Sequence, residues 1–157
     1  MNKEIVKYPN PILKKRAEEI KDVSEDIKRL AEDMIETMIS SRGIGLAGPQ
    51  VGESKRIIIV RTESGPKVFI NPKIIKKSWS KEVRKEGCLS LPGSYLEIKR
   101  AKEIEVEALN ENGQMIKMKV QGLTARIIQH EIDHLDGILI FNRLGFWQRF
   151  RNRKKFK

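Results

Sequence analysis

The clearest helical pattern of apolar positions lies in residues 25–40, EDIKRLAEDMIETMIS. Apolar side chains recur there every three or four residues, which places them on one face of a helix. They are Ile27, Leu30, Ala31, Met34, Ile35 and Met38. Ser24 is a suitable N-cap, and Gly43 stands just past the expected end. The pattern predicts an amphipathic helix with one face in the core.

From Lys55 onward the pattern changes to short segments rich in β-branched residues. Three of them follow one another: RIIIVR (56–61), KVFINP (67–72) and PKIIKKSW (72–79). The pairs Gly65-Pro66 and Asn71-Pro72 interrupt them, and such pairs commonly mark turns. We therefore expect several short strands in this region.

Two later segments predict a β-hairpin. EIEVEAL (103–109) alternates strictly between acidic and apolar residues, and QMIKMKV (114–120) follows the turn NENG. Gly122 then leads into a second helix, which contains QHEIDHLDG (129–137). The order of helix, antiparallel strands and helix predicts an α+β fold, with antiparallel β-sheets packed around a buried second helix.

The composition fits one soluble domain. The chain has 157 residues, of which 39% are apolar and 34% are charged. We expect a single domain over residues 1–157, since this length can form one core. No apolar run is long enough for a membrane span, and the first twenty residues contain acids and no apolar signal segment. A cytoplasmic protein is therefore expected.

The positive charge is concentrated at the C-terminal end. No acidic residue follows Asp136, whereas residues 143–157 contain seven Lys and Arg. Without those seven residues the formal net charge falls from +11 to +4. A basic tail of this kind suits a polyanion such as ribosomal RNA, and it is equally typical of a solvated end that aids solubility.

The second helix contains both histidines of the chain, His130 and His134. At a spacing of four residues they share one helix face with Leu123 and Ile127 and can bind one metal ion. Glu131 borders that face. Two histidines hydrogen-bonded within the core are the alternative, but the intervening glutamate favours a metal site.

A catalytic metal usually has three protein ligands, so a third must be found. Metzincin proteases place it six residues after the second histidine, where this chain has Ile140. No acid follows Asp136, so the third ligand must lie upstream, and EGCLS (86–90) is the candidate. Cys88 is the only cysteine, which excludes an internal disulfide, and its thiolate is a suitable ligand. Simple burial of Cys88 is the alternative.

A glycine-rich stretch, GIGLAGPQVG (43–52), lacks the GK[ST] of a phosphate-binding P-loop. Its backbone N–H groups and the Gln50 amide could approach a substrate carbonyl. A plain connector between helix and strand is the alternative reading of this stretch.

Together, the three stretches resemble the peptide deformylase family, which is marked by a GxGLAAPQ loop, an EGCLS segment and a QHExDHLxG helix in this order. The opening YPNPILKKRAEEI is also similar, so the resemblance covers nearly the whole chain. Gly48 stands where the family usually has alanine, which adds backbone freedom to the loop. The family pattern includes Gln129, for which the sequence indicates no role. The end after residue 140 is shorter than in many bacterial members.

The resemblance implies removal of the formyl group from the N-terminal formyl-methionine of newly synthesised polypeptides. Cys88, His130 and His134 would hold one divalent metal, Fe²⁺ in the cell, with Zn²⁺, Ni²⁺ or Co²⁺ possible in the same site. Metal-bound hydroxide would attack the formyl carbon. Glu131 would act as general base and then as general acid.

The resemblance also assigns the remaining site residues. The backbone N–H of Leu89 and the amide of Gln50 would stabilise the oxyanion. Apart from the resemblance, Asp133 lies on the helix flank away from the metal and could pair with Arg100 or Arg126 and steady the helix, and a solvated Asp133 is the alternative. The expected substrate-binding residues are Ile44, Gly45, Glu86, Gly87, Leu123, Arg126 and Ile127.

Expected partners are N-formylmethionyl nascent peptides and, through the basic tail, the ribosome. We expect a monomer and no DNA binding.

Two other functions stay open on the sequence alone. One is a zincin-type endopeptidase, which would not need Cys88. The other is a ribosome- or RNA-binding protein with a structural metal, which would need neither Glu131 nor Gln50.

Overall fold

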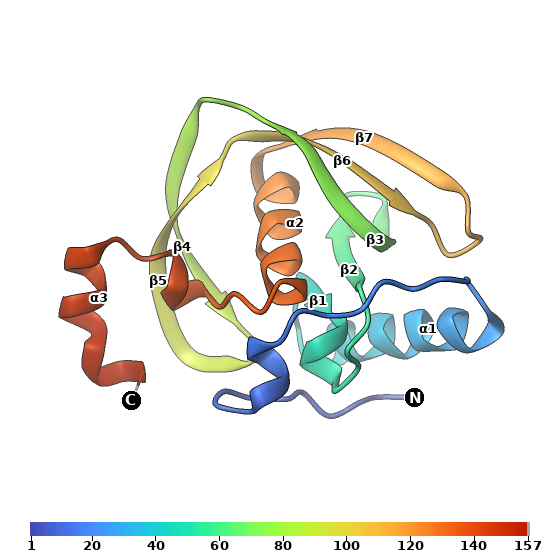
Figure 1. The fold of residues 1–157 in the computed structure, drawn as a ribbon, viewed down its shortest axis with the longest axis horizontal. Helices are drawn as coiled ribbons and strands as arrows, with labels where there is room; N and C mark the ends of the chain where they lie inside the picture. Colours follow the sequence, from blue (N-terminus) through green and yellow to red (C-terminus); the bar gives the residue numbers. More distant parts are fainter. Residues whose placement is uncertain (157) are drawn as a thin grey trace.

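A computed structural model describes residues 1–156 of the chain (Figure 1). Its helices are α1 (Glu25–Ser40), α2 (Gly122–Leu135) and α3 (Phe146–Asn152), with short 3-10 helices η1 (Pro11–Lys14), η2 (Gly48–Val51), η3 (Ile140–Arg143) and η4 (Arg153–Phe156). Its strands are β1 (Gly45–Ala47), β2 (Ile57–Thr62), β3 (Gly65–Lys77), β4 (Lys81–Cys88), β5 (Leu91–Ala101), β6 (Glu103–Leu109) and β7 (Met115–Gln121). Within the described residues, no helix is both long and apolar enough to cross a membrane.

The strands form two antiparallel sheets on either side of α2. Five strands make one sheet in the order β1-β2-β3-β6-β7, and β4 pairs with β5 in a separate hairpin. Figure 1 shows α2 in the centre, with the β4–β5 hairpin on its left and the larger sheet above it and to its right. The predicted α+β fold, with antiparallel sheets around the second helix, is confirmed.

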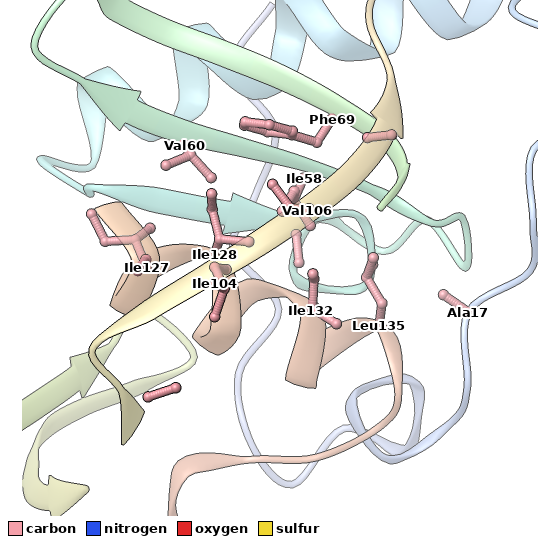
Figure 2. Close-up of a cluster of buried hydrophobic side chains, with 14 residues drawn as sticks. Ala17, Ile58, Val60, Phe69, Ile104, Val106, Ile127, Ile128, Ile132 and Leu135 are labelled. Atoms are coloured by element: carbon pink, nitrogen blue, oxygen red, sulfur yellow. The ribbon is translucent and has the colours of Figure 1, made fainter. Parts of the chain in front are cut away.

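The apolar run in β2 arises because this strand is covered on both faces. Ile57 and Ile59 belong to the core cluster that α1 covers, whereas Ile58 and Val60 belong to the cluster around α2. Figure 2 shows this second cluster, with Ile58 and Val60 near Ile128 of α2. Strands buried on both faces read as continuous apolar segments, and β2 does so for that reason.

By contrast, β6 is covered on one face only. Ile104, Val106 and Ala108 are buried in the cluster around α2, and the glutamates between them point the other way. The strict alternation of the sequence is the pattern of a half-buried strand. The strand begins and ends where the sequence predicted, and it forms the predicted hairpin with β7.

The first helix also matches its prediction, with one difference at its end. α1 covers Glu25–Ser40, and the Ser24 side chain accepts a hydrogen bond from the N–H of Ile27. The residue with the left-handed backbone is Arg42, at φ 56°, rather than the glycine that follows it. Helices more often use glycine in this conformation.

The sequence predicted a break between two strands at Asn71-Pro72. In the structure a single strand, β3, continues through this pair. Asn71 takes a left-handed backbone conformation at φ 51°, which asparagine tolerates better than most residues. Its side chain bonds the N–H and the C=O of Ile20. The pairing with β6 shifts between Ile70 and Lys73, so the missing N–H of proline falls at an irregular point of the ladder.

Gln129, which had no role from sequence, attaches α2 to the end of β5. Its Oε1 accepts from the N–H of Ala101 at 3.1 Å, and its Nε2 donates to the C=O of Ala101 at 2.9 Å and of Ala125 at 3.0 Å. Gln129 and Ala101 are each 5% exposed, so water does not readily replace these bonds.

We predict that Gln129→Leu lowers the free energy of unfolding by about 2–4 kcal/mol, because the buried N–H of Ala101 loses its acceptor and two further hydrogen bonds disappear. Urea denaturation of the metal-loaded protein measures this. The control Gln114→Leu lies in the exposed β6–β7 turn and should change the value by less than about 0.5 kcal/mol. Equal effects of the two variants would contradict the assigned role of Gln129.

Candidate metal centre

Cys88 and the two histidines lie together where the end of β4 meets α2. Their possible ligand atoms are all within 4.8 Å of one another. Cys88 Sγ lies 3.2 Å from His134 Nε2, and the centroids of the two imidazole rings are 5.0 Å apart. Four residues make about one helical turn, so His130 and His134 project from one face toward the same point. The three residues proposed as ligands from sequence are thus brought together.

The polar atoms around this cluster fit a bound metal. Nδ1 of His130 hydrogen-bonds Glu86, which leaves its Nε2 available as a ligand. Among the described residues, His134 Nδ1 and Glu131 Oε2 are buried without a hydrogen-bond partner, and such atoms are rare in folded proteins. One thiolate and two imidazoles suit several divalent transition metals and leave a position for water or substrate.

Glu86 is the buried anion that holds this arrangement. Its two oxygens accept from Nε and Nη2 of Arg100 at 2.9 and 2.8 Å, from Arg126, and share a hydrogen bond of 2.9 Å with Nδ1 of His130. Burial alone would raise the pKa of Glu86, but the hydrogen bonds from Arg100 and His130 hold it well below its usual range. Glu86 is therefore a carboxylate, and it fixes the orientation of the His130 ring.

Asp133 extends the network on the other side of Arg100. Its carboxylate accepts from Nη1 of Arg100 at 2.6 Å and from Nη2 and Nε of Arg143 at 2.6 and 2.9 Å. Of the two partners expected for Asp133, Arg100 is the one it contacts. Arg126 donates instead to Glu86 and to two backbone carbonyls of the β4–β5 hairpin. Arg143, the first residue of the basic tail, is thus tied to α2.

Glu131 lies beside the histidines and against β1. A Cβ atom at Gly45 would lie 2.4 Å from Glu131 Oε1 and 2.7 Å from a methyl group of Ile127, so only glycine leaves room for this carboxyl group. Burial raises the pKa of Glu131 to about 7, although the charge of His130 opposes the shift. A carboxyl group with this pKa can accept and release protons near neutral pH.

Gln50 is held with its amide nitrogen toward the metal cluster. Its Oε1 accepts from the N–H of Ala47 at 2.9 Å, and its Nε2 lies 3.5 Å from Cys88 Sγ and 3.2 Å from Ser90 Oγ. The side chain is 1% exposed. The backbone of the glycine-rich loop therefore fixes which end of the amide faces the site.

The sequence suggested that Gly48 adds backbone freedom to this loop, but in the structure the position is tightly packed. A Cβ atom at this position would lie 2.4 Å from the carbonyl oxygen of Lys55 and 2.9 Å from that of Glu53. The backbone of residues 53–55 thus packs directly on Gly48. In this chain the glycine accommodates a close approach of two backbone segments.

Ser90 is a site residue that the sequence reasoning missed. Its hydroxyl accepts from Gln50 and donates to the C=O of Val6 at 2.7 Å. The N–H of Val6 bonds the C=O of Gln50, and the N–H of Tyr8 bonds the C=O of Ser90. An N-terminal segment thus ties together the two loops that flank the cluster. The partners are 84 residues apart in sequence, so no local pattern could have indicated the contact.

A cavity of about 490 Å³ opens onto the cluster. All seven residues expected to bind substrate line it, namely Ile44, Gly45, Glu86, Gly87, Leu123, Arg126 and Ile127. The apolar ones form a wall that runs from the buried Ile127 to the half-exposed Leu123 and Ile44. The charged groups of Glu86 and Arg126 are bonded to each other and to the protein, which leaves a substrate little access to them.

The walls of this cavity contain further polar groups, and Tyr95 is among the lining residues that the sequence did not indicate. Leu89 and Gln50 both line it, and within residues 1–156 the backbone N–H of Leu89 has no acceptor. Tyr95 also lines the cavity and is 66% exposed. Its ring lies 2.8 Å from where a Cβ of Gly87 would be, so that glycine makes room for the ring. The site thus has an apolar wall, hydrogen-bond donors, a proton-exchanging carboxyl group and three metal-ligand side chains.

Comparison with known proteins agrees with this arrangement. The family model described as polypeptide deformylase matches residues 2–150. A peptide deformylase from Dictyoglomus thermophilum is 50% identical over 143 residues, which are 91% of this chain and 93% of that protein. A second, from Thermodesulfovibrio yellowstonii, is 46% identical over 98% of this chain and 96% of its own length.

Solved structures give the same result. The crystal structure of peptide deformylase from Thermotoga maritima has a TM-score of 0.90 at 41% identity and covers 92% of this chain and 99% of its own. That of the Ehrlichia chaffeensis enzyme in complex with actinonin has a TM-score of 0.91 at 40% identity and covers 98% and 95%. The chain therefore belongs to the peptide deformylase family and is a metal-dependent hydrolase that removes the N-formyl group from nascent peptides.

Proposed function

We propose that Cys88, His130 and His134 hold one divalent metal, Fe²⁺ in the cell, and that Zn²⁺, Ni²⁺ or Co²⁺ can replace it. A divalent metal in this position lowers the pKa of a water molecule and polarises the formyl carbonyl. The observation that carries the proposal is the convergence of these three side chains beside an apolar-walled cavity, next to Glu131, whose buried Oε2 has no hydrogen-bond partner among the described residues.

Glu131 moves the protons of the reaction. Its carboxylate accepts a proton from the attacking water and returns it to the amine that leaves when the formyl C–N bond breaks. The buried Oε2 without a partner and the pKa of about 7 support this role, because such a group changes protonation state readily at neutral pH.

Two donors stabilise the negative oxygen that develops on the formyl carbon. These are the backbone N–H of Leu89, which has no acceptor within residues 1–156, and Nε2 of Gln50, which faces the same cavity. Ala47 and Ser90 hold the Gln50 amide, so this donor is oriented before substrate binds.

The substrate peptide adds to the edge of the larger sheet. β1 is the edge strand of that sheet, and Ile44 and Gly45 line the cavity beside it, where an extended peptide can pair with the backbone. The methionine side chain rests on Leu123 and Ile127. Gly87 lines the cavity from the end of β4, where the absence of a side chain makes room for the Tyr95 ring.

Glu86 and Arg126 act as positioning residues. Glu86 orients His130, and Arg126 neutralises Glu86 and ties it to the β4–β5 hairpin. The role in substrate binding expected from the sequence stays a prediction for both residues, whose charged groups are already bonded within the protein.

The wider setting follows from the substrate. We propose one catalytic domain in residues 1–157 that acts as a monomer in the cytoplasm on N-formylmethionyl nascent peptides. The basic tail from residue 143 would dock on the ribosome. Support comes from α3, where Phe146 and Trp147 are 75% and 73% exposed beside the basic Arg149 and Arg151.

Glu131→Gln should lower the rate of formate release from formyl-Met-Ala-Ser by about 100- to 10,000-fold, because the amide cannot take the proton. The metal content should stay at one ion per chain. The assay uses anaerobic, iron- or nickel-loaded protein, with Glu111→Gln in the exposed β6–β7 turn as the control that keeps the full rate. An undiminished rate in Glu131→Gln would remove this residue from the mechanism. If even the unaltered protein releases no formate, the chain is not a deformylase.

Cys88→Ser should lose most of its metal on dialysis, since the weaker oxygen donor replaces a thiolate. Metal content is measured by elemental analysis, and Glu131→Gln serves as the control that retains the ion. A zincin-type endopeptidase would keep its metal in Cys88→Ser. One ion per chain in that variant would therefore contradict the proposed ligand set.

Removal of the residues after Gly145 should weaken binding to ribosomes at low salt and leave the rate on formyl-Met-Ala-Ser unchanged, because the site lies within the rest of the chain. Co-sedimentation with purified ribosomes measures the first quantity. Equal sedimentation of the full and shortened chains would exclude the tail as a docking element.

A further inference from the structure

A second cavity, of about 400 Å³, lies behind α2, and we call it the basic cavity. Its wall includes eight cationic side chains: Arg16, Arg56, Lys73, Lys77, Lys81, Lys99, Arg100 and Arg143. They come from the N-terminal segment, the residue before β2, β3, β4, β5 and the residues after α2. Segments far apart in the sequence thus bring positive charge to one concave place.

The basic cavity has a different position from the metal centre. It contacts the opposite side of α2, through Gln129, Ile132, Asp133 and Asp136, and shares no lining residue with the active-site cavity. Arg100 and Arg143 bond the carboxylates of Glu86 and Asp133 in the network behind the metal centre. The other six cations are not among the proposed ligands, proton carriers, positioning or substrate-binding residues, so the hydrolytic function does not account for their charge.

The acids of the wall do not balance this charge. Asp133 and Asp136 are the only carboxylates that line the basic cavity within the described chain. Asp133 is bonded to Arg100 and Arg143, and Asp136 lies 3.0 Å from Nη1 of Arg56. Eight cations against two carboxylates make an excess of six positive charges among the lining side chains, of which Arg100 is also paired with Glu86 outside the cavity wall.

The excess resides mainly in four exposed lysines, Lys73, Lys77, Lys81 and Lys99. Among the described residues, none of the four has a carboxylate within ion-pair distance. Below them the floor is rigid, because Arg56 and Arg100 are 7% and 5% exposed and are fixed by hydrogen bonds. Like charges around a concave surface raise the local potential and concentrate anions there.

We propose that the basic cavity is a binding site for a ligand with two or more phosphate groups. A multiply charged anion fits the excess of positive charge better than a single carboxylate. Lysine ammonium groups bind phosphate oxygens as point charges and need no fixed geometry. Two sources have this chemistry, a free compound such as pyrophosphate and the backbone of a single-stranded RNA.

The test compares two triple variants of the full chain. The cavity variant changes Lys73, Lys81 and Lys99 to Gln, one on each of three strands. The control variant changes three exposed lysines outside the basic cavity and without an ion pair in the described chain to Gln: Lys7, Lys21 and Lys117. Both variants have the same net charge, and all six side chains are exposed, so both should fold and release formate at the unaltered rate.

Isothermal titration with pyrophosphate gives the first result. The cavity variant should bind about tenfold or more weakly than the unaltered protein, because three positive charges no longer face the anion, and the control variant should bind as the unaltered protein does. A ten-nucleotide RNA followed by fluorescence anisotropy over a range of salt concentrations gives the second. Its salt slope should fall by about 0.7 for each lysine that no longer neutralises a phosphate.

If pyrophosphate binds, and binds more weakly to the cavity variant than to the control variant, the ligand is a small phosphorylated compound. If only the RNA binds, and its salt slope is lower in the cavity variant, the ligand is the RNA backbone. If neither probe binds, or if the cavity and control variants weaken binding equally, the proposal is wrong. Equal weakening would mean that overall charge, and no defined site, attracts the anion.

Discussion

The structure depends on the burial of α2, a helix that carries polar side chains through the middle of the protein. Residues 125–135 are all buried, and six of these eleven are polar or charged: Arg126, Gln129, His130, Glu131, Asp133 and His134. Each such group loses hydration and must find a partner inside the protein. A helix of this composition is stable in the core only if the surrounding elements supply those partners.

One hairpin supplies most of them. β4 and β5 provide Glu86 for His130 and Arg126, Arg100 for Asp133, and the backbone of Ala101 for Gln129. Cys88 completes the cluster with His134. Two side chains keep an atom without a partner among the described residues, Glu131 and His134, and both lie at the metal cluster. The buried polar groups that the fold does not satisfy are therefore the ones to which we assign a role in the proposed reaction.

Parts of this arrangement could be predicted because the information is local. The spacing of His130 and His134, the alternation of β6 and the cap of α1 each follow from neighbouring residues. Cys88 became the candidate third ligand because no histidine or acid follows Asp136, and the resemblance to a family then favoured a ligand over simple burial. The glycine-rich loop indicated only that the amide of Gln50 could approach a substrate carbonyl, and its role as an oxyanion donor, like that of the N–H of Leu89, came from resemblance to a family.

Other parts depend on contacts between distant segments and could not be read from the sequence. The β4–β5 hairpin has mixed polarity on both faces, because it buries Glu86 and Arg100 as an ion pair and exposes Val83 and Tyr95. No alternation therefore marked it as a strand pair. The same holds for Ser90, whose partner Val6 lies near the other end of the chain. The basic cavity, too, forms only when the N-terminal segment, β3 and β5 meet behind α2.

The central claim is that one thiolate and two imidazoles share a single metal. X-ray absorption spectroscopy of the zinc- or nickel-loaded protein measures this directly, because sulfur and nitrogen scatter at different distances. The account predicts one sulfur at about 2.3 Å and two imidazole nitrogens at about 2.0–2.1 Å for zinc. A metal shell with no sulfur, or with a single imidazole, would contradict it.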